Sequence, residues 1–72
     1  MTFGEKLILK REAKGYSRKK LADMTGIHPS TIKNYEEGVS DPRLSVLLIL
    51  ADTLDFSIDA MLERVKYAVH KK

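Results

Sequence analysis

A chain of 72 residues has room for one domain with one small core, and extra burial through self-association is expected at this size. It has no cysteine, which excludes a disulfide scaffold and a thiol-ligated metal and fits a reducing cytoplasm. The N-terminus lacks the apolar core of a signal peptide, and the longest apolar run, residues 46–51, is far short of the roughly 20 residues that span a bilayer. We therefore expect a soluble cytoplasmic protein without a membrane partner, and Met1 with a tapering basic tail favours a complete small protein.

The net charge of +3 is mild, but the charges are unevenly distributed along the chain. Residues 6–20 hold seven cations and one anion, whereas residues 36–63 hold seven anions and one cation. A folded chain with this order has a basic end and an acidic end, and the basic end is a candidate surface for a polyanion. The alternative is that the lysine-rich helix faces are merely solvated, and charge alone does not decide between the two.

The first predicted helix covers residues 2–14. Thr2 is a plausible N-cap, and Glu5 three residues later completes a capping box. Gly15 stands where a helix commonly ends, because glycine tolerates the left-handed backbone conformation there. Ile8 and Leu9 are expected to be exposed, which indicates a contact surface on this helix.

The second predicted helix covers residues 18–25, with Ser17 as its N-cap. Its first turn holds three cations, Arg18, Lys19 and Lys20. Each cation at this positive end of the helix dipole is unfavourable by about 0.3–1 kcal/mol. A phosphate docked on the helix end would make the same cations favourable, because free N–H groups and basic side chains would converge on it. We prefer this interpretation to a merely solvated basic turn, which stays the alternative.

The third predicted helix covers residues 29–37. Gly26 supplies the positive φ of a tight turn, and Pro29 suits the first helical position, which makes His28 the N-cap. Ile32 and Tyr35 point into the core. The outer face carries small polar and basic groups: Pro29, Ser30, Lys33 and Asn34, with Thr31 at its edge. Such groups reach base edges in a major groove, and the preceding glycine turn favours a DNA-reading helix-turn-helix over a solvated helix face.

The fourth predicted helix covers residues 44–54 and is apolar nearly all round, which is typical of burial on more than one side. Its expected inward face is Leu44, Leu47, Leu48, Ala51 and Leu54. This pattern fits a central core helix as well as a helix at a dimer interface that includes Ile49.

The fifth predicted helix covers residues 57–69 and carries one long apolar stripe. With nothing left in the chain to cover it, the stripe indicates a second copy of the chain. The residues expected at a homodimer interface are Ile49, Ile58, Met61, Val65 and Val69. Fraying of the last residues is the alternative.

Residues 3–62 resemble the Cro and phage-repressor type of helix-turn-helix domain, often called the XRE family. The matching residues are Arg11, Gly15, Ser17, Leu21, Ala22, Gly26, Ile27, Ile32, Glu36, Gly38, Pro42, Leu44, Leu48, Leu50, Ala51, Leu54, Ser57 and Leu62. The resemblance implies an all-α, five-helix, lambda-repressor-like domain over residues 1–72 that binds operator DNA as a dimer with its third helix in the major groove.

Carried over by position, the resemblance also assigns the site residues. The base-reading positions fall on Pro29, Ser30, Thr31, Lys33 and Asn34. The phosphate contact at the start of the second helix falls on Arg18, and Ser40 and Arg43 are the candidates in the loop after the third. Lys19, from the cationic first turn of the second helix, is also expected to contact phosphate. Arg11 and Glu36 occupy the positions of a buried salt bridge that ties the first helix to the end of the third. The chain departs from the family pattern at Thr25, where an aliphatic residue is usual.

No catalytic group of residues emerges, because His28 and His70 stand alone and no glycine-rich phosphate loop follows a strand. We expect no enzyme activity, no metal and no cofactor. The predicted function is that of a sequence-specific regulator, a repressor, that binds a palindromic double-stranded DNA operator as a homodimer. The alternative is a protein-interaction module or antitoxin of the same fold, whose helices at residues 44–54 and 57–69 bind a partner protein.

Overall fold

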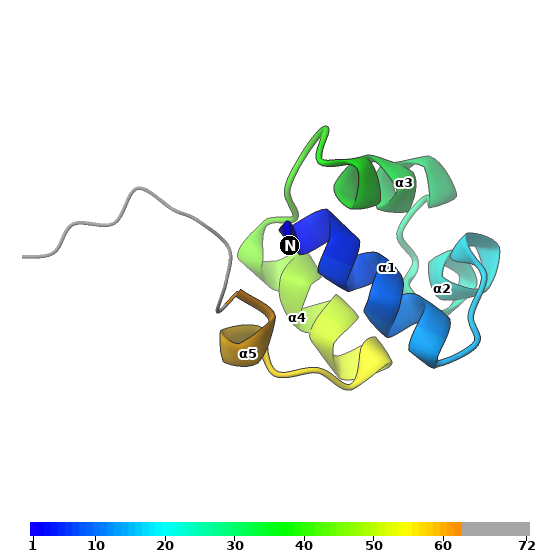
Figure 1. The fold of residues 1–72 in the computed structure, drawn as a ribbon. Helices are drawn as coiled ribbons and strands as arrows, with labels where there is room; N and C mark the ends of the chain where they lie inside the picture. Colours follow the sequence, from blue (N-terminus) through cyan, green and yellow to red (C-terminus); the bar gives the residue numbers. More distant parts are fainter. Residues whose placement is uncertain (63–72) are drawn as a thin grey trace, which may run out of the picture.

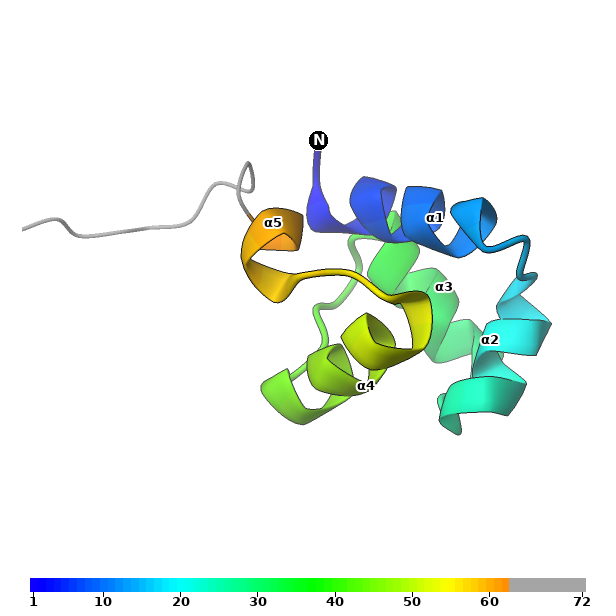
Figure 2. The same cartoon turned by 90° about the horizontal axis from the view of Figure 1, so that it is seen from below.

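A computed structural model describes residues 1–62, which form five α-helices and no strand (Figure 1). The helices are α1 (Phe3–Ala13), α2 (Arg18–Thr25), α3 (Pro29–Glu37), α4 (Leu44–Leu54) and α5 (Ile58–Leu62). α1 packs mainly on α3, α2 contacts both α3 and α4, and α5 contacts α1 and α4. Figures 1 and 2 place α2 and α5 at opposite ends of the molecule, with the other helices between them. The predicted all-α, five-helix class is confirmed.

Local sequence signals explain where the first three helices begin and end. The capping box is present, since Thr2 Oγ1 accepts from the Glu5 N–H at 3.1 Å and Glu5 Oε1 accepts from the Thr2 N–H at 2.9 Å. Ser17 Oγ accepts from the Lys20 N–H at 3.0 Å and caps α2. Gly26 ends α2 with a φ of 77°, a conformation that a residue with a β-carbon rarely adopts. The glycine elbow between α2 and α3 therefore forms as predicted.

One hydrophobic core joins all five helices. Its buried members are Phe3, Leu7, Leu21, Ala22, Ile32, Tyr35, Leu47, Leu50, Leu54 and Met61. Ile27 lies in the turn between α2 and α3 and packs against this core, which fixes the elbow from inside. Among the helices of residues 1–62, none is long and apolar enough to cross a membrane.

The predicted inward face of α4 is confirmed at Leu47 and Leu54 but wrong at Leu44 and Leu48. Leu47, Leu50 and Leu54 are buried, whereas Leu44 and Leu48 are 66% and 52% exposed. Because the helix is apolar nearly all round, its periodicity did not fix which side meets the core. The packing of α4 against α2 and α5 does so instead, and it leaves leucines on the outer side.

The described residues among those expected at a dimer interface are not all available to a partner. Ile49 is 43% exposed on α4, but Met61 is only 2% exposed and belongs to the core of the single chain. Ile58 is half-buried and packs against the same core. Met61 therefore has no free side chain to offer a second copy, because α5 turns it towards α1 and α4. Val65 and Val69, with the predicted extension of the fifth helix to residue 69, lie outside the described residues.

Candidate nucleic-acid interface

The outer face of α3 presents polar side chains to solvent. Ser30, Lys33 and Asn34 are exposed, while Ile32 and Tyr35 on the opposite face are buried. The amphipathic order of the helix explains this division, because its two large apolar groups are three residues apart and share one side. Two further residues predicted to read bases flank this face: Pro29 is exposed and Thr31 is half-buried.

His28 caps α3 with its side chain, although histidine is an uncommon N-cap. The N–H of Ser30 donates to His28 Nδ1 at 3.1 Å, and the hydroxyl of Ser30 lies 2.8 Å from the same nitrogen. The imidazole therefore orients Ser30 at the start of the outer face.

Lys33 and Asn34 keep their side chains available at the surface. Lys33 Nζ lies 4.0 Å from Glu37 Oε2, and both side chains are about half exposed, at 54% and 49%. An exposed pair of this length contributes little, so Lys33 can exchange it for another anion. Asn34 uses its backbone carbonyl to close the helix end, accepting from the Val39 N–H at 2.9 Å and the Ser40 N–H at 3.4 Å.

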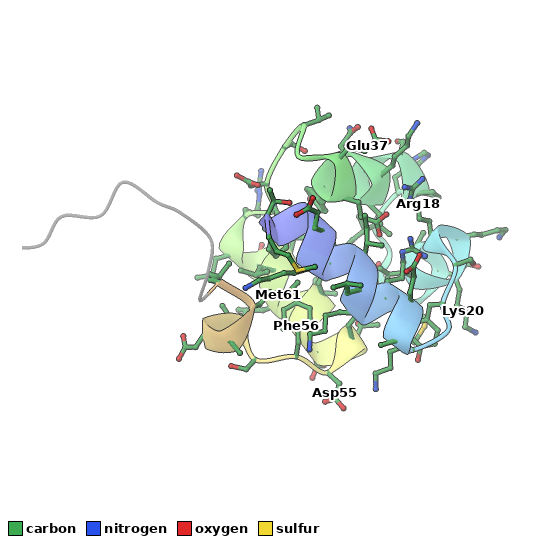
Figure 3. All side chains as sticks on the ribbon, in the orientation of Figure 1. Arg18, Lys20, Glu37, Asp55, Phe56 and Met61 are labelled. Atoms are coloured by element: carbon green, nitrogen blue, oxygen red, sulfur yellow. The ribbon has the colours of Figure 1, made fainter. Side chains whose placement is uncertain are left out.

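The first turn of α2 is cationic and contains no acidic residue. Lys19 is 82% exposed and meets only Asp23, at 3.4 Å, among the residues described. Lys20 is also exposed, and Figure 3 shows it at the outer end of α2, away from the core. These ammonium groups therefore stand at the positive end of the α2 dipole without a carboxylate in the same turn, as the sequence indicated.

A buried carboxylate on α3 brings two arginines together. The Glu36 side chain is fully buried, with Oε2 2.7 Å from Arg11 Nε and Oε1 2.8 Å from Arg18 Nε. The Arg11–Glu36 ion pair lies where the family resemblance places it and joins α1 to α3. Arg18, expected to contact phosphate, shares the same carboxylate, which the sequence reading did not foresee. Figure 3 shows Arg18 in the space between α2 and α3.

The loop between α3 and α4 carries the remaining predicted phosphate contacts. Ser40 and Arg43 are both exposed. Arg43 is the N-cap residue of α4 and makes no capping bond with its side chain. The guanidinium of Arg43 is therefore not engaged in closing the helix.

Two structural residues of the site were missed in the sequence. Gly4 lets α1 cross α3 closely, because a β-carbon there would stand 2.6 Å from the carbonyl oxygen of Tyr35 and meet that of Glu36 as well. Thr25 stabilises the elbow between α2 and α3. Its Oγ1 donates to the Leu21 carbonyl at 2.8 Å and accepts from the Ile27 N–H at 3.2 Å. The sequence offers one signal for each role: a glycine inside a helix for Gly4, and a threonine where an aliphatic residue is usual for Thr25.

Exposed apolar side chains gather on the outer side of α4. Leu44, Leu48 and Ile49 are 66%, 52% and 43% exposed, and Val39 in the preceding loop is 69% exposed. We call Leu44, Leu48 and Ile49 the α4 face. Leu9 on α1 is another exposed apolar residue, at 50%. Large exposed aliphatic groups on one helix commonly mark a contact surface.

Titratable side chains in the described part form no metal site. Residues 1–62 contain no group of three or more histidine, aspartate or glutamate side chains placed to hold an ion. Within the same range, every buried side-chain nitrogen and oxygen has a hydrogen-bond partner.

Comparison with known proteins gives the same assignment as the fold. A helix-turn-helix family model, HTH_3, matches residues 7–61. The chain is 38% identical over 56 residues to repressor protein C of Escherichia phage P2, covering 78% of this chain and 57% of that protein. It is 41% identical over 56 residues to the HTH-type transcriptional regulator AnsR of Bacillus subtilis (strain 168), covering 78% of this chain and 48% of the relative.

A prophage-derived relative in the same Bacillus strain, the uncharacterized HTH-type transcriptional regulator YonR, is 39% identical over 61 residues. That match covers 85% of this chain and 56% of the relative. The chain thus spans about half the length of these curated relatives, whose names are those of regulators rather than enzymes. By the family match and the five-helix fold together, the chain belongs to the XRE-type helix-turn-helix family.

Proposed function

We propose that the chain is a sequence-specific regulator of transcription that binds double-stranded DNA. The observation that carries this proposal is the outward face of α3, with Ser30, Lys33 and Asn34 exposed beside the cationic first turn of α2. Hydroxyl, ammonium and amide groups on one exposed helix suit the donor and acceptor pattern of a major groove. The relatives named as a repressor and as transcriptional regulators support the same role.

The mechanism is binding without chemistry. The α3 face reads bases, whereas the basic groups of α2 and the exposed Ser40 and Arg43 hold the phosphate backbone. The regulator acts as a repressor by occupying its operator, in the cytoplasm where that DNA is accessible. Two phosphate-contacting surfaces on either side of α3 would fix its depth and direction in the groove.

The chain binds a palindromic operator as a homodimer in this proposal. Support comes from the α4 face, whose three aliphatic side chains a second copy would cover. Half-sites read by the two α3 helices would then lie about 34 Å apart, or one helical turn of DNA.

Selection of bound duplexes from a random pool, followed by a salt titration of the recovered duplex, tests the function. We expect one preferred, two-fold related sequence. The logarithm of affinity should fall by about 0.9 for each phosphate neutralised per tenfold rise in salt. A chain that enriches no sequence and binds the pool with a flat salt response would contradict the proposal.

A second candidate function rests on the same α4 face together with Leu9. In this role the chain is a protein-interaction module or antitoxin of the same fold, and the apolar surface binds a different protein. The two functions are compatible, since a regulator can bind DNA with α3 and a partner with α4. A purified chain that stays monomeric at high concentration would favour the second candidate over the homodimer.

A further inference from the structure

The carboxylate of Glu36 is the common acceptor for two arginines from different helices. Arg11 donates from Nε to Oε2 at 2.7 Å and from Nη2 to Oε1 at 3.3 Å. Arg18 donates from Nε to Oε1 at 2.8 Å. One buried side chain of α3 thereby fixes guanidinium groups of both α1 and α2, each by charge-assisted hydrogen bonds.

The two arginines use this carboxylate differently. Arg11 also donates from Nη1 to the carbonyl of Tyr16 at 2.9 Å, and its side chain is only 11% exposed. All three of its nitrogens are therefore engaged inside the domain. The Arg18 side chain is 38% exposed. Within residues 1–62, it donates to Glu36 through Nε only. Its two terminal amino groups, with four N–H donors, remain for a ligand at the surface.

The charge of this cluster points to the kind of ligand. Two guanidinium groups against one carboxylate leave one positive charge in excess. The carboxylate of Glu36 is fully buried, so no solvent reaches that side of the cluster. The partly exposed Arg18 is where an anion can approach. Because the guanidinium is planar, a hydrogen bond at Nε fixes the direction of its terminal amino groups, and a phosphate oxygen pair matches their spacing.

We propose that Glu36 is a positioning residue for DNA: it holds Arg18 by Nε so that the terminal amino groups of Arg18 grip one backbone phosphate. Arg18 keeps both partners at once and does not leave Glu36 when DNA binds. Since Glu36 belongs to α3, the phosphate contact and the base-reading helix form one rigid unit. This inference rests on the proposed DNA-binding function and adds the coupling between a buried carboxylate and a phosphate contact.

A double-mutant cycle on the full chain tests the coupling, with the duplex recovered by selection as the probe. The variants are Arg18→Ala, Glu36→Gln and both together, each shown to be folded by circular dichroism. Lys14→Ala is the control for loss of one charge, because Lys14 pairs with Asp55 at 3.5 Å, away from α3. We expect Arg18→Ala to lower affinity by about tenfold, as for one charge-assisted bond, and to lower the salt slope by about 0.9.

Glu36→Gln should lower affinity about tenfold while Arg18 is present. In the Arg18→Ala background the same change should alter affinity less than about twofold, because the residue it positions is gone. Lys14→Ala should leave the salt slope unchanged. An equal loss from Glu36→Gln in both backgrounds would overturn the proposal, since Glu36 would then only support the fold.

The outcomes separate this inference from the proposed function. If the wild type binds the duplex but Arg18→Ala keeps its affinity and salt slope, the coupling is wrong and DNA binding stands. If the wild type binds no duplex, both are wrong. Should Glu36→Gln not fold, the Nε–Hε signal of Arg18 in wild-type NMR spectra decides: it should stay protected from exchange after DNA is added, and its return to the free-arginine position would overturn the proposal.

Discussion

Gly4 of α1 lies directly against the backbone of Tyr35 at the end of α3. A β-carbon on Gly4 would be 2.6 Å from the Tyr35 carbonyl oxygen. Because that oxygen belongs to the backbone, no side-chain rotation could relieve the clash. The packing of α1 on α3 at this point needs a residue without a side chain. The close approach holds α1 near enough for Arg11 to reach Glu36.

Gly4→Ala should therefore destabilise the protein, although the same change in a helix interior usually stabilises by about 1 kcal/mol. We expect the free energy of unfolding to fall by about 1–3 kcal/mol, because α1 must move away from α3. Urea denaturation followed by circular dichroism measures it. Glu12→Ala on the exposed side of α1 is the control and should stay within about 0.5 kcal/mol of wild type. A stabilised Gly4→Ala variant would contradict the close crossing.

Thr25→Val removes the hydroxyl that braces the α2–α3 elbow while keeping the shape of the side chain. It loses the bond to the Leu21 carbonyl and leaves the Ile27 N–H without its acceptor. Thermal unfolding should show that the free energy of unfolding falls by about 1–2 kcal/mol. Thr53→Val in α4 is the matched control, since Thr53 is also half-buried and makes no side-chain hydrogen bond within the described chain. Equal losses for the two variants would mean that the hydroxyl of Thr25 does not stabilise the elbow.

The elbow also shows how far sequence reasoning reaches. Thr2, Ser17, Gly26 and Gly38 act through neighbours in the chain, so caps and turns could be placed from local chemistry alone. The outward face of α3 followed from its clear amphipathic spacing.

Features that depend on contacts between distant segments could not be predicted in this way. The role of Gly4 requires knowing that α1 crosses α3, and the shared carboxylate of Glu36 depends on the conformation of Arg18 from another helix. Leu48 is exposed against the prediction, because α4 is apolar nearly all round and only its packed neighbours decide which side meets the core. Met61, predicted at an interface, is buried in the core of the single chain instead.

Asn34→Ala should change which duplex the chain prefers. An amide that reads a base edge discriminates against the wrong base by about 1–3 kcal/mol, so its loss relaxes selection at one position of each half-site. Lys33→Ala should relax a neighbouring position. Selection from a random pool, repeated with each variant, measures the preference, and Lys14→Ala is the control that should keep the wild-type profile. An unchanged profile for Asn34→Ala would remove that residue from base reading.

Leu48→Asp should convert the proposed homodimer into a monomer. The leucine is 52% exposed in the single chain, so a carboxylate there is tolerated in the monomer, but it would be costly inside an apolar interface. Ile49→Asp should act in the same way, and sedimentation velocity measures the mass. Leu9→Asp on α1 is the control, with a similar exposure of 50% but outside the α4 face. A dimer that persists in both α4 variants would place the interface elsewhere.

Entry of α3 into the DNA groove beside the cationic start of α2 can be tested by NMR with the duplex recovered by selection. Titration of that duplex into the labelled chain reports which backbone amides meet DNA. We predict the largest shifts at Arg18–Lys20 and at Ser30–Asn34, with the loop at residues 38–43 affected next. Shifts confined to α4 and α5, with the α3 amides unmoved at saturation, would contradict the account.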